Sequence, residues 1–169
     1  VTITREVLRS LCMQLPESTI AIQGYGNVGS AAAVLFHVSG AKVEAVSDVN
    51  GAIYRKGGID ILALQDYVRQ HRTVVGFSGA DPIPADEILT MAVDVVVPAA
   101  LQHVITAENA NQIKAKVVVE GANGPTTPDA DVILQVKGVV SLLDLNAREL
   151  PIRQDVVGAI VSLDGDPRV

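Results

Sequence analysis

The 169-residue sequence has no tryptophan, few other aromatic residues and a single cysteine. With aromatics at 3%, the core has to be built from Val, Ile, Leu and Ala. The lone Cys12 excludes an internal disulfide and a zinc site made of several cysteines. Because it falls among leucines in an expected helix, we expect Cys12 to be a buried structural thiol.

Concentrated positive charge and long apolar runs are also missing. The 13 Lys and Arg against 19 Asp and Glu give a net charge of −6 without a basic cluster, which argues against nucleic-acid binding. No run approaches the roughly 18–20 apolar residues that cross a membrane, and we expect no leader peptide, since the first residues lack the pattern of one. The three histidines are too far apart for a metal motif. We therefore expect a cytoplasmic chain with no metal, membrane or nucleic-acid partner.

What is present is a 49% share of hydrophobic residues, in short runs that alternate with amphipathic segments. Runs rich in Val and Ile indicate strands buried on both faces of a parallel sheet. We predict strands at Thr19–Gln23, Lys42–Ser47, Ala92–Pro98, Lys116–Glu120 and Val139–Leu143. We predict a loop at Gly76–Pro84 and helices at Thr4–Leu15, Asn27–Val38, Ile59–Arg72, Thr106–Ile113 and Pro128–Lys137. This alternation predicts an α/β fold of the doubly wound Rossmann type, a mostly parallel sheet with helices on both faces.

The most informative motif is the segment Gly24–Gly29 (GYGNVG), which has the G-x-G-x-x-G spacing. The spacing alone is weak, but here it follows an expected strand and opens an expected helix, as a dinucleotide-binding loop must. Gly24 would permit the tight turn, Gly26 would remove a Cβ that blocks a pyrophosphate, and Gly29 would let the helix approach the sheet. The N–H groups and positive dipole end of the helix would face the phosphates.

A dinucleotide-binding loop also needs an acidic residue about 20 positions further on. Asp48 lies nineteen residues after Gly29, at the end of the second expected strand. Its carboxylate could accept hydrogen bonds from both adenosine ribose hydroxyls, whereas a 2′-phosphate would meet a like charge, so Asp48 favours NAD over NADP. In the alternative interpretation, Gly24–Gly29 is only a tight turn and Asp48 a solvated turn residue beside Asn50-Gly51.

The run Ala21–Gly29 (AIQGYGNVG) resembles the cofactor domain of the glutamate/leucine/phenylalanine/valine dehydrogenase family. Further similar segments are Val46–Gly51, Ile53–Tyr54, Val95–Ile105 and Val119–Pro128. The last of these, VEGANGPTTP, is quite specific and points to the glutamate branch. The resemblance covers residues 1–143. We expect a dinucleotide-binding domain over residues 1–145 and a divergent tail over residues 146–169, with Asp155–Leu163 as a candidate extra edge strand.

The resemblance implies roles for individual residues. The pyrophosphate of NAD or NADP would be held by Gly24, Gly26, Asn27, Val28 and Gly29. The adenosine ribose would be bound by Asp48. The cofactor cleft would be lined by Pro98, Ala99 and Ala100, and the nicotinamide ribose would be reached by Asn123. Because the family uses similar Asp-bearing loops with either dinucleotide, the resemblance weakens the preference for NAD.

A complete enzyme of this family has a second, larger domain that binds the amino acid and carries a catalytic lysine and aspartate. None of the five lysines here lies in the glycine-rich segment that the family uses, so we assign no catalytic residue. The resemblance implies the coenzyme half of an enzyme that oxidatively deaminates glutamate to 2-oxoglutarate, inactive without its substrate domain. Its partners would be that domain or another dehydrogenase chain, and the surface left bare would favour a homo-oligomer.

Two alternatives stay open from the sequence. One is a stand-alone cofactor-binding or regulatory protein without catalysis. The other is a Rossmann-type fold that has lost cofactor binding, in which the cleft is empty or blocked. An upstream domain encoded in the same gene would favour the enzyme, and a tail lying across Gly24–Gly29 would favour the lost site.

Overall fold

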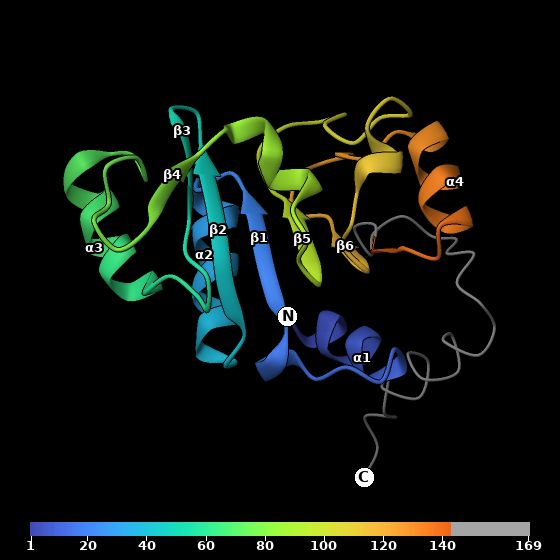
Figure 1. Ribbon diagram of the computed structural model, residues 1–169, viewed down its shortest axis with the longest axis horizontal. Helices are drawn as coiled ribbons and strands as arrows, with labels where there is room; N and C mark the ends of the chain where they lie inside the picture. The colour runs from blue at the N-terminus through green and yellow to red at the C-terminus, as the bar shows by residue number, and fades with distance from the viewer. Residues whose placement is uncertain (143–169) are drawn as a thin grey trace, which may run out of the picture.

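The computed structural model describes residues 1–142, and both the predicted boundary at residues 145/146 and the candidate strand Asp155–Leu163 lie outside the described residues. Within residues 1–142, seven strands form one sheet in the order β4-β3-β2-β1-β5-β6-β7 (Figure 1). The strands are β1 (Thr19–Gln23), β2 (Lys42–Asp48), β3 (Gly51–Tyr54), β4 (Asp81–Ile83), β5 (Val95–Pro98), β6 (Val117–Val119) and β7 (Val140–Leu142).

The sheet is parallel except at one edge. Strand β1 pairs in parallel with β2 and β5, and β6 pairs in parallel with β5 and β7. The β2–β3 pair is antiparallel because a two-residue turn at Val49-Asn50 folds the chain straight back. The β3–β4 pair is also antiparallel, and the chain reaches β4 only after α3. The predicted mostly parallel α/β fold is confirmed.

Helices cover both faces of this sheet. The α-helices are α1 (Thr2–Ser10), α2 (Asn27–Val38), α3 (Ile61–His71) and α4 (Pro128–Val136). Short 3₁₀-helices are η1 (Leu15–Glu17), η2 (Ala85–Thr90) and η3 (Ala110–Gln112). In Figure 1, α2 lies behind β2 and the green η2 segment passes in front of the sheet.

Two apolar clusters fill the space between the sheet and these helices. Successive side chains of a strand point to opposite faces, so Ile20 and Ile22 of β1 belong to one cluster and Ala21 to the other. The first cluster includes residues of α1, α2 and α3, and the second includes residues of η2, η3 and α4. Burial of the sheet on both faces explains why the buried positions of its strands are mostly Val, Ile and Ala.

Two predicted segments differ in the structure. The segment Gly76–Pro84 is not all loop, because β4 lies within it and pairs with β3 at the edge of the sheet. The predicted helix Thr106–Ile113 contains only the 3₁₀-helix η3. The Asn109 side chain accepts from the Thr106 N–H at 2.9 Å and donates to the Val104 carbonyl oxygen at 2.7 Å. The Ala110 N–H makes one α-helical bond, to the Thr106 carbonyl oxygen at 2.9 Å, but the next bonds join residues three apart, from Gln112 to Asn109 at 2.8 Å and from Ile113 to Ala110 at 3.3 Å. The segment therefore continues as a 3₁₀-helix.

The expectation of a buried Cys12 was wrong. Helix α1 ends at Ser10, and the Met13 N–H closes it by donating to the Leu8 carbonyl oxygen at 2.8 Å. Cys12 takes the left-handed conformation after the helix, with φ +57°, and its side chain is exposed. Because the helix ends before Cys12, this residue no longer follows the helical spacing that buries Val7 and Leu8.

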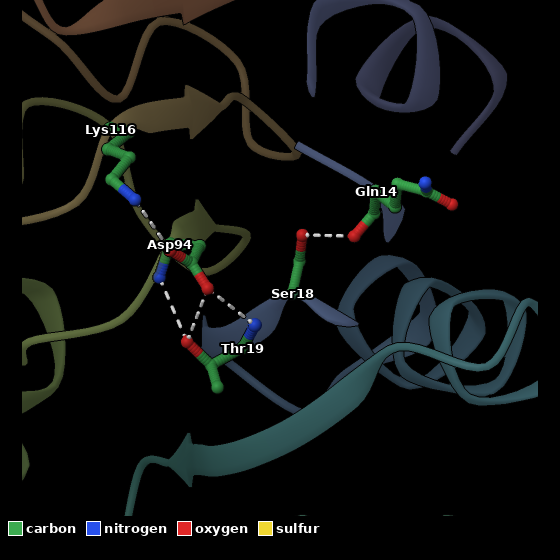
Figure 2. Close-up of polar contacts among 5 residues, drawn as sticks. All are labelled: Gln14, Ser18, Thr19, Asp94 and Lys116. Carbon is green, nitrogen blue, oxygen red and sulfur yellow. Dashed lines mark hydrogen bonds and ion pairs between the residues drawn. The ribbon is translucent and has the colours of Figure 1, made fainter. Parts of the chain in front are cut away.

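A polar network fastens the amino ends of three strands (Figure 2). The backbone N–H and hydroxyl of Thr19 each lie 3.0 Å from Asp94 Oδ2, and the Asp94 N–H donates to Thr19 Oγ1 at 3.0 Å. Lys116 Nζ lies 3.2 Å from Asp94 Oδ1. Thr19 begins β1, Asp94 precedes β5 and Lys116 precedes β6. These contacts hold the amino ends of the three strands together. The loops at the carboxyl ends of the strands are the place to look for a binding site.

Candidate functional site

The carboxyl end of β1 is where the order of the sheet reverses. From β1 the chain crosses through α2 to β2 on one side, and later returns to β5 on the other side. In open parallel sheets, ligands bind in the crevice beside such a reversal. Three loops lie there: the glycine loop (residues 24–29) after β1, the β5 loop (residues 98–100) and the β6 loop (residues 120–124).

The three glycines of the glycine loop differ in what surrounds them. Gly24 has φ +97°, and a Cβ on it would lie 2.8 Å from the Cβ of Ala100. A Cβ on Gly29 would overlap the carbonyl oxygen of Gly24, so α2 reaches the strand only because this residue is glycine. A Cβ on Gly26 would meet nothing within 4 Å. Packing therefore requires Gly24 and Gly29, whereas Gly26 borders open space.

Backbone hydrogen bonds bring the other two loops to the glycine loop. The Ala99 N–H donates to the Gln23 carbonyl oxygen at 2.8 Å. The N–H groups of Gly121 and Ala122 both donate to the Pro98 carbonyl oxygen at 3.0 Å. These bonds put the predicted cleft residues of β5 between the other two loops.

Small residues let these loops touch. A Cβ on Gly121 would lie 3.0 Å from the Cβ of Ala99 and 3.3 Å from Cγ1 of Val28. The structure thus brings Val28, Ala99 and Gly121 together. Asn123 follows two residues after Gly121 and is exposed. The contacts described above hold Gly121 and Ala122 in place, but none of them involves the Asn123 side chain.

The N-terminus of α2 is uncapped by any side chain. Gly26 is the N-cap residue, and no side chain bonds to the first-turn N–H groups from that position. Asn27 and Val28, the first two helical residues, are exposed. Because the first N–H groups of a helix have no partner within the helix, they can donate to an anion in front of Gly26.

Tyr25 anchors the glycine loop from beneath. Its side chain is 8% exposed and belongs to the apolar cluster between α2 and the sheet. Its hydroxyl has no hydrogen-bond partner among the described residues. Burial raises the pKa of Tyr25 to about 12, so the phenol stays neutral near pH 7. The loop is held by an apolar ring on one side while Gly26 stays open on the other.

Asp48 lies at the end of β2, and its carboxylate is hydrogen-bonded to backbone and side-chain groups of the same chain. Its Oδ1 accepts from the N–H groups of Asn50 at 2.8 Å and Gly51 at 3.2 Å, and Oδ2 accepts from the Val74 N–H at 2.7 Å. The Thr73 side chain is also hydrogen-bonded to this carboxylate. Burial would raise the pKa of Asp48, but these hydrogen bonds outweigh burial and lower it. The carboxylate is therefore ionised and fixed.

Two of the lysines have structural partners. Lys116 pairs with Asp94, and Lys137 Nζ donates to the carbonyl oxygens of Asn111 at 2.7 Å and Ile113 at 2.8 Å.

Over residues 1–142, no group of three or more His, Cys, Asp and Glu could hold a metal ion. No helix in the same range is long and apolar enough to cross a membrane.

Sequence reasoning missed the residues that hold the predicted ones in place. Ser47 Oγ accepts from the Gly24 N–H at 3.2 Å, which ties the glycine loop to β2. The close approach at Gly121 could have been predicted from the run GANG, because glycines directly after a strand often mark a tight contact between loops. Thr73 and Val74 carried none, because only the folded chain brings them to Asp48.

Comparison with known proteins extends the likeness across most of the chain. The family model of glutamate/leucine/phenylalanine/valine dehydrogenases matches residues 1–149. The glutamate dehydrogenase of Thermotoga maritima is 49% identical over 132 residues, which are 78% of this chain and 32% of that protein. Glutamate dehydrogenase B of Halobacterium salinarum is 44% identical over 144 residues, or 85% of this chain and 34% of that protein.

Solved structures agree with these relatives. The glutamate dehydrogenase of Peptoniphilus asaccharolyticus matches with a TM-score of 0.67 and 34% identity, over 84% of this chain and 32% of that one. The hetero-hexameric, leucine-bound glutamate dehydrogenase of Thermus thermophilus matches with a TM-score of 0.77 and 25% identity, over 85% of this chain and 33% of that one. The chain therefore spans about a third of the length of its relatives. On its sequence match and its fold, the chain belongs to the glutamate/leucine/phenylalanine/valine dehydrogenase family.

Proposed function

We propose that this chain is the coenzyme-binding part of a dehydrogenase that acts on glutamate, and that it binds NAD or NADP at the carboxyl edge of its sheet. The observation that carries the proposal is the contrast within the glycine loop. Gly24 and Gly29 are packed against other atoms, whereas the Cβ position of Gly26 is empty to 4 Å, in front of an uncapped helix. This is the shape that a pyrophosphate group requires.

Each loop contributes a different part of the binding site. The N–H groups at Asn27, Val28 and Gly29 would donate to the pyrophosphate. The segment Pro98–Ala100 would line the cleft beside the nicotinamide, and Asn123 would reach the nicotinamide ribose. The bound dinucleotide supplies hydride transfer, and the work of this chain is to bind and orient it.

The reaction of the complete enzyme would be the oxidative deamination of glutamate to 2-oxoglutarate, as the names of the relatives suggest. Those relatives are about three times longer than the matched part, so we assign the substrate-binding and proton-transferring groups to the part that this chain does not match. We expect the 169-residue chain by itself not to turn over glutamate. Cytoplasmic location remains a prediction. No observation favours the alternative of a non-catalytic regulatory protein.

The proposal is tested by titrating the purified chain with NADH and NADPH while following nicotinamide fluorescence. We expect saturable binding in the wild type. Gly26→Val places a branched side chain in the space of the pyrophosphate and should weaken binding at least about tenfold, equivalent to about 1.4 kcal/mol. Ser39→Val adds similar bulk at the far end of the same helix and should leave binding unchanged.

Melting curves of both variants show whether the fold is intact, because valine is a poorer N-cap than glycine. A folded wild-type chain that binds neither dinucleotide would refute the proposal. Equal binding by the wild type and Gly26→Val would place the ligand elsewhere.

A further inference from the structure

Asp48 has already used the hydrogen-bonding capacity that a ribose would need. An ionised carboxylate has about four lone-pair positions. In this chain, those positions face the N–H groups of Asn50, Gly51 and Val74 and the side chain of Thr73. To accept from two ribose hydroxyls as well, the carboxylate would have to give up bonds that hold the protein together.

These bonds join two segments that are distant in the sequence. Asn50 lies in the turn between β2 and β3, and Gly51 is the first residue of β3. Thr73 and Val74 follow α3, and Val74 lies 26 residues beyond Asp48. The Thr73 hydroxyl also accepts from the Val75 N–H at 3.2 Å, which continues the network into the second segment. The carboxylate therefore acts as the link between the turn and the loop after α3.

We infer that Asp48 is a positioning residue, which fixes the turn after β2 against the loop after α3, and that it does not select between NADH and NADPH. If the chain binds dinucleotides as proposed above, the consequence is that it accepts both NADH and NADPH. This consequence rests on the proposed function. Beside Asp48, the side chains exposed to solvent are those of Val49, which is fully exposed, and Asn50.

The charge of Asp48 is also partly compensated. Three N–H dipoles and the Thr73 hydroxyl point at the carboxylate. A 2′-phosphate approaching this edge would therefore meet a smaller repulsion than from a carboxylate that faces the ligand.

The test measures the ratio of NADH to NADPH affinity for the wild-type chain and for Asp48→Asn. We expect the two wild-type Kd values to agree within about tenfold, and the ratio to change by less than about threefold in Asp48→Asn. Selection by the carboxylate predicts instead a wild-type preference for NADH of about a hundredfold or more, which Asp48→Asn would remove. That result in a folded variant would overturn the inference.

The positioning role has its own readout, independent of any ligand. Amide hydrogen exchange at Val74 should accelerate in Asp48→Asn, because the amide N–H then loses its carboxylate acceptor. Thr73→Val, which removes the hydroxyl at similar volume, should lower the melting temperature, and Thr73→Ser, which keeps it, should not. Unchanged exchange at Val74 in Asp48→Asn would overturn the positioning role. If the wild type binds neither dinucleotide, the proposed function fails, and the exchange measurement still decides the role of Asp48.

Discussion

Two tyrosine hydroxyls occupy opposite situations in this molecule. Tyr25 is buried beneath the glycine loop, and its hydroxyl has no hydrogen-bond partner among residues 1–142. The hydroxyl of Tyr67, on α3, donates to the Val75 carbonyl oxygen at 2.9 Å. A buried hydroxyl without a partner destabilises a fold, whereas one with a partner contributes to stability.

The pair Tyr25→Phe and Tyr67→Phe therefore gives a matched prediction. We expect Tyr25→Phe to leave the free energy of unfolding unchanged or to raise it by up to about 1 kcal/mol, and Tyr67→Phe to lower it by about 1 kcal/mol. Urea denaturation of both variants measures the difference. An equal loss in both would mean that the Tyr25 hydroxyl has a partner in solution.

At the residue scale, the sequence predicted correctly those residues whose type is required by the local backbone conformation and close packing. Gly24 and Gly29 follow from the motif because a side chain at either would collide with neighbouring atoms. The partners of Asp48 could not be predicted from the motif, because Val74 meets it only after β2 and α3 have packed. The same motif that identified Asp48 therefore carried no information about which way its carboxylate points.

At the scale of elements, Asp94 fastens the amino ends of β1, β5 and β6. Burial would raise the pKa of Asp94, but hydrogen bonds from Thr19 and Lys116, together with the positive charge of Lys116, lower it from its ordinary value of 3.8. A carboxylate with a lowered pKa in the folded state stabilises the fold above its unfolded pKa. That stabilisation is lost as the pH falls through the folded pKa.

We predict that Asp94→Asn reduces the free energy of unfolding at pH 7 by about 1–2 kcal/mol, because charge-assisted bonds to Thr19 and Lys116 are lost. The variant should also lose part of the stability difference between pH 7 and pH 3, since its side chain no longer titrates. Denaturation curves at both pH values measure this.

The control is Asp66→Asn on α3, where the carboxylate pairs with Arg69 on an exposed surface. Exposed pairs contribute little, so its free energy of unfolding at pH 7 should stay within about 0.5 kcal/mol of the wild type. A loss at pH 7 in Asp66→Asn as large as in Asp94→Asn would contradict the assignment of a special role to the network at the amino edge.

The elements that the sequence predicted well are those with a strong local pattern. Buried runs such as Thr19–Gln23 became strands, and Thr127 caps α4 by accepting from the Ala130 N–H, as a cap residue before proline should. β4 was missed because its sequence, DPI, has little strand character of its own and forms a strand only by pairing with β3. The helix predicted at Thr106–Ile113 was too long, because its cap residue and apolar spacing suit an α-helix and a turn followed by a 3₁₀-helix equally well.

At the scale of the whole molecule, large apolar side chains remain exposed on two helices. Leu35 and Val38 on α2 are 56% and 74% exposed, and Val132 and Val136 on α4 are 61% and 85% exposed. Figure 1 shows these two helices on well separated parts of the molecule. On each helix the two side chains lie about one turn apart and form a small apolar patch, and exposed apolar patches favour association.

We therefore predict that the 169-residue chain forms a homo-oligomer. Sedimentation velocity over a range of concentrations should show a species heavier than the 17.7 kDa monomer, with a population that rises with concentration. Addition of NADH should leave the mass distribution unchanged if association and cofactor binding use different surfaces. A monomer at every concentration would contradict the prediction.

The position of β1 has a consequence for how the chain folds during synthesis. This strand is central in the sheet, yet it leaves the ribosome long before β5, since Thr19 and its partner Asp94 are separated by 75 residues. At roughly 5–20 residues per second, several seconds pass between the two. During this interval the β5-facing edge of Ile20–Ile22 has no strand to pair with, and such an edge attracts other chains. The nascent chain therefore carries an unpaired, apolar strand edge, a site for association with other chains, until Val95–Pro98 is made.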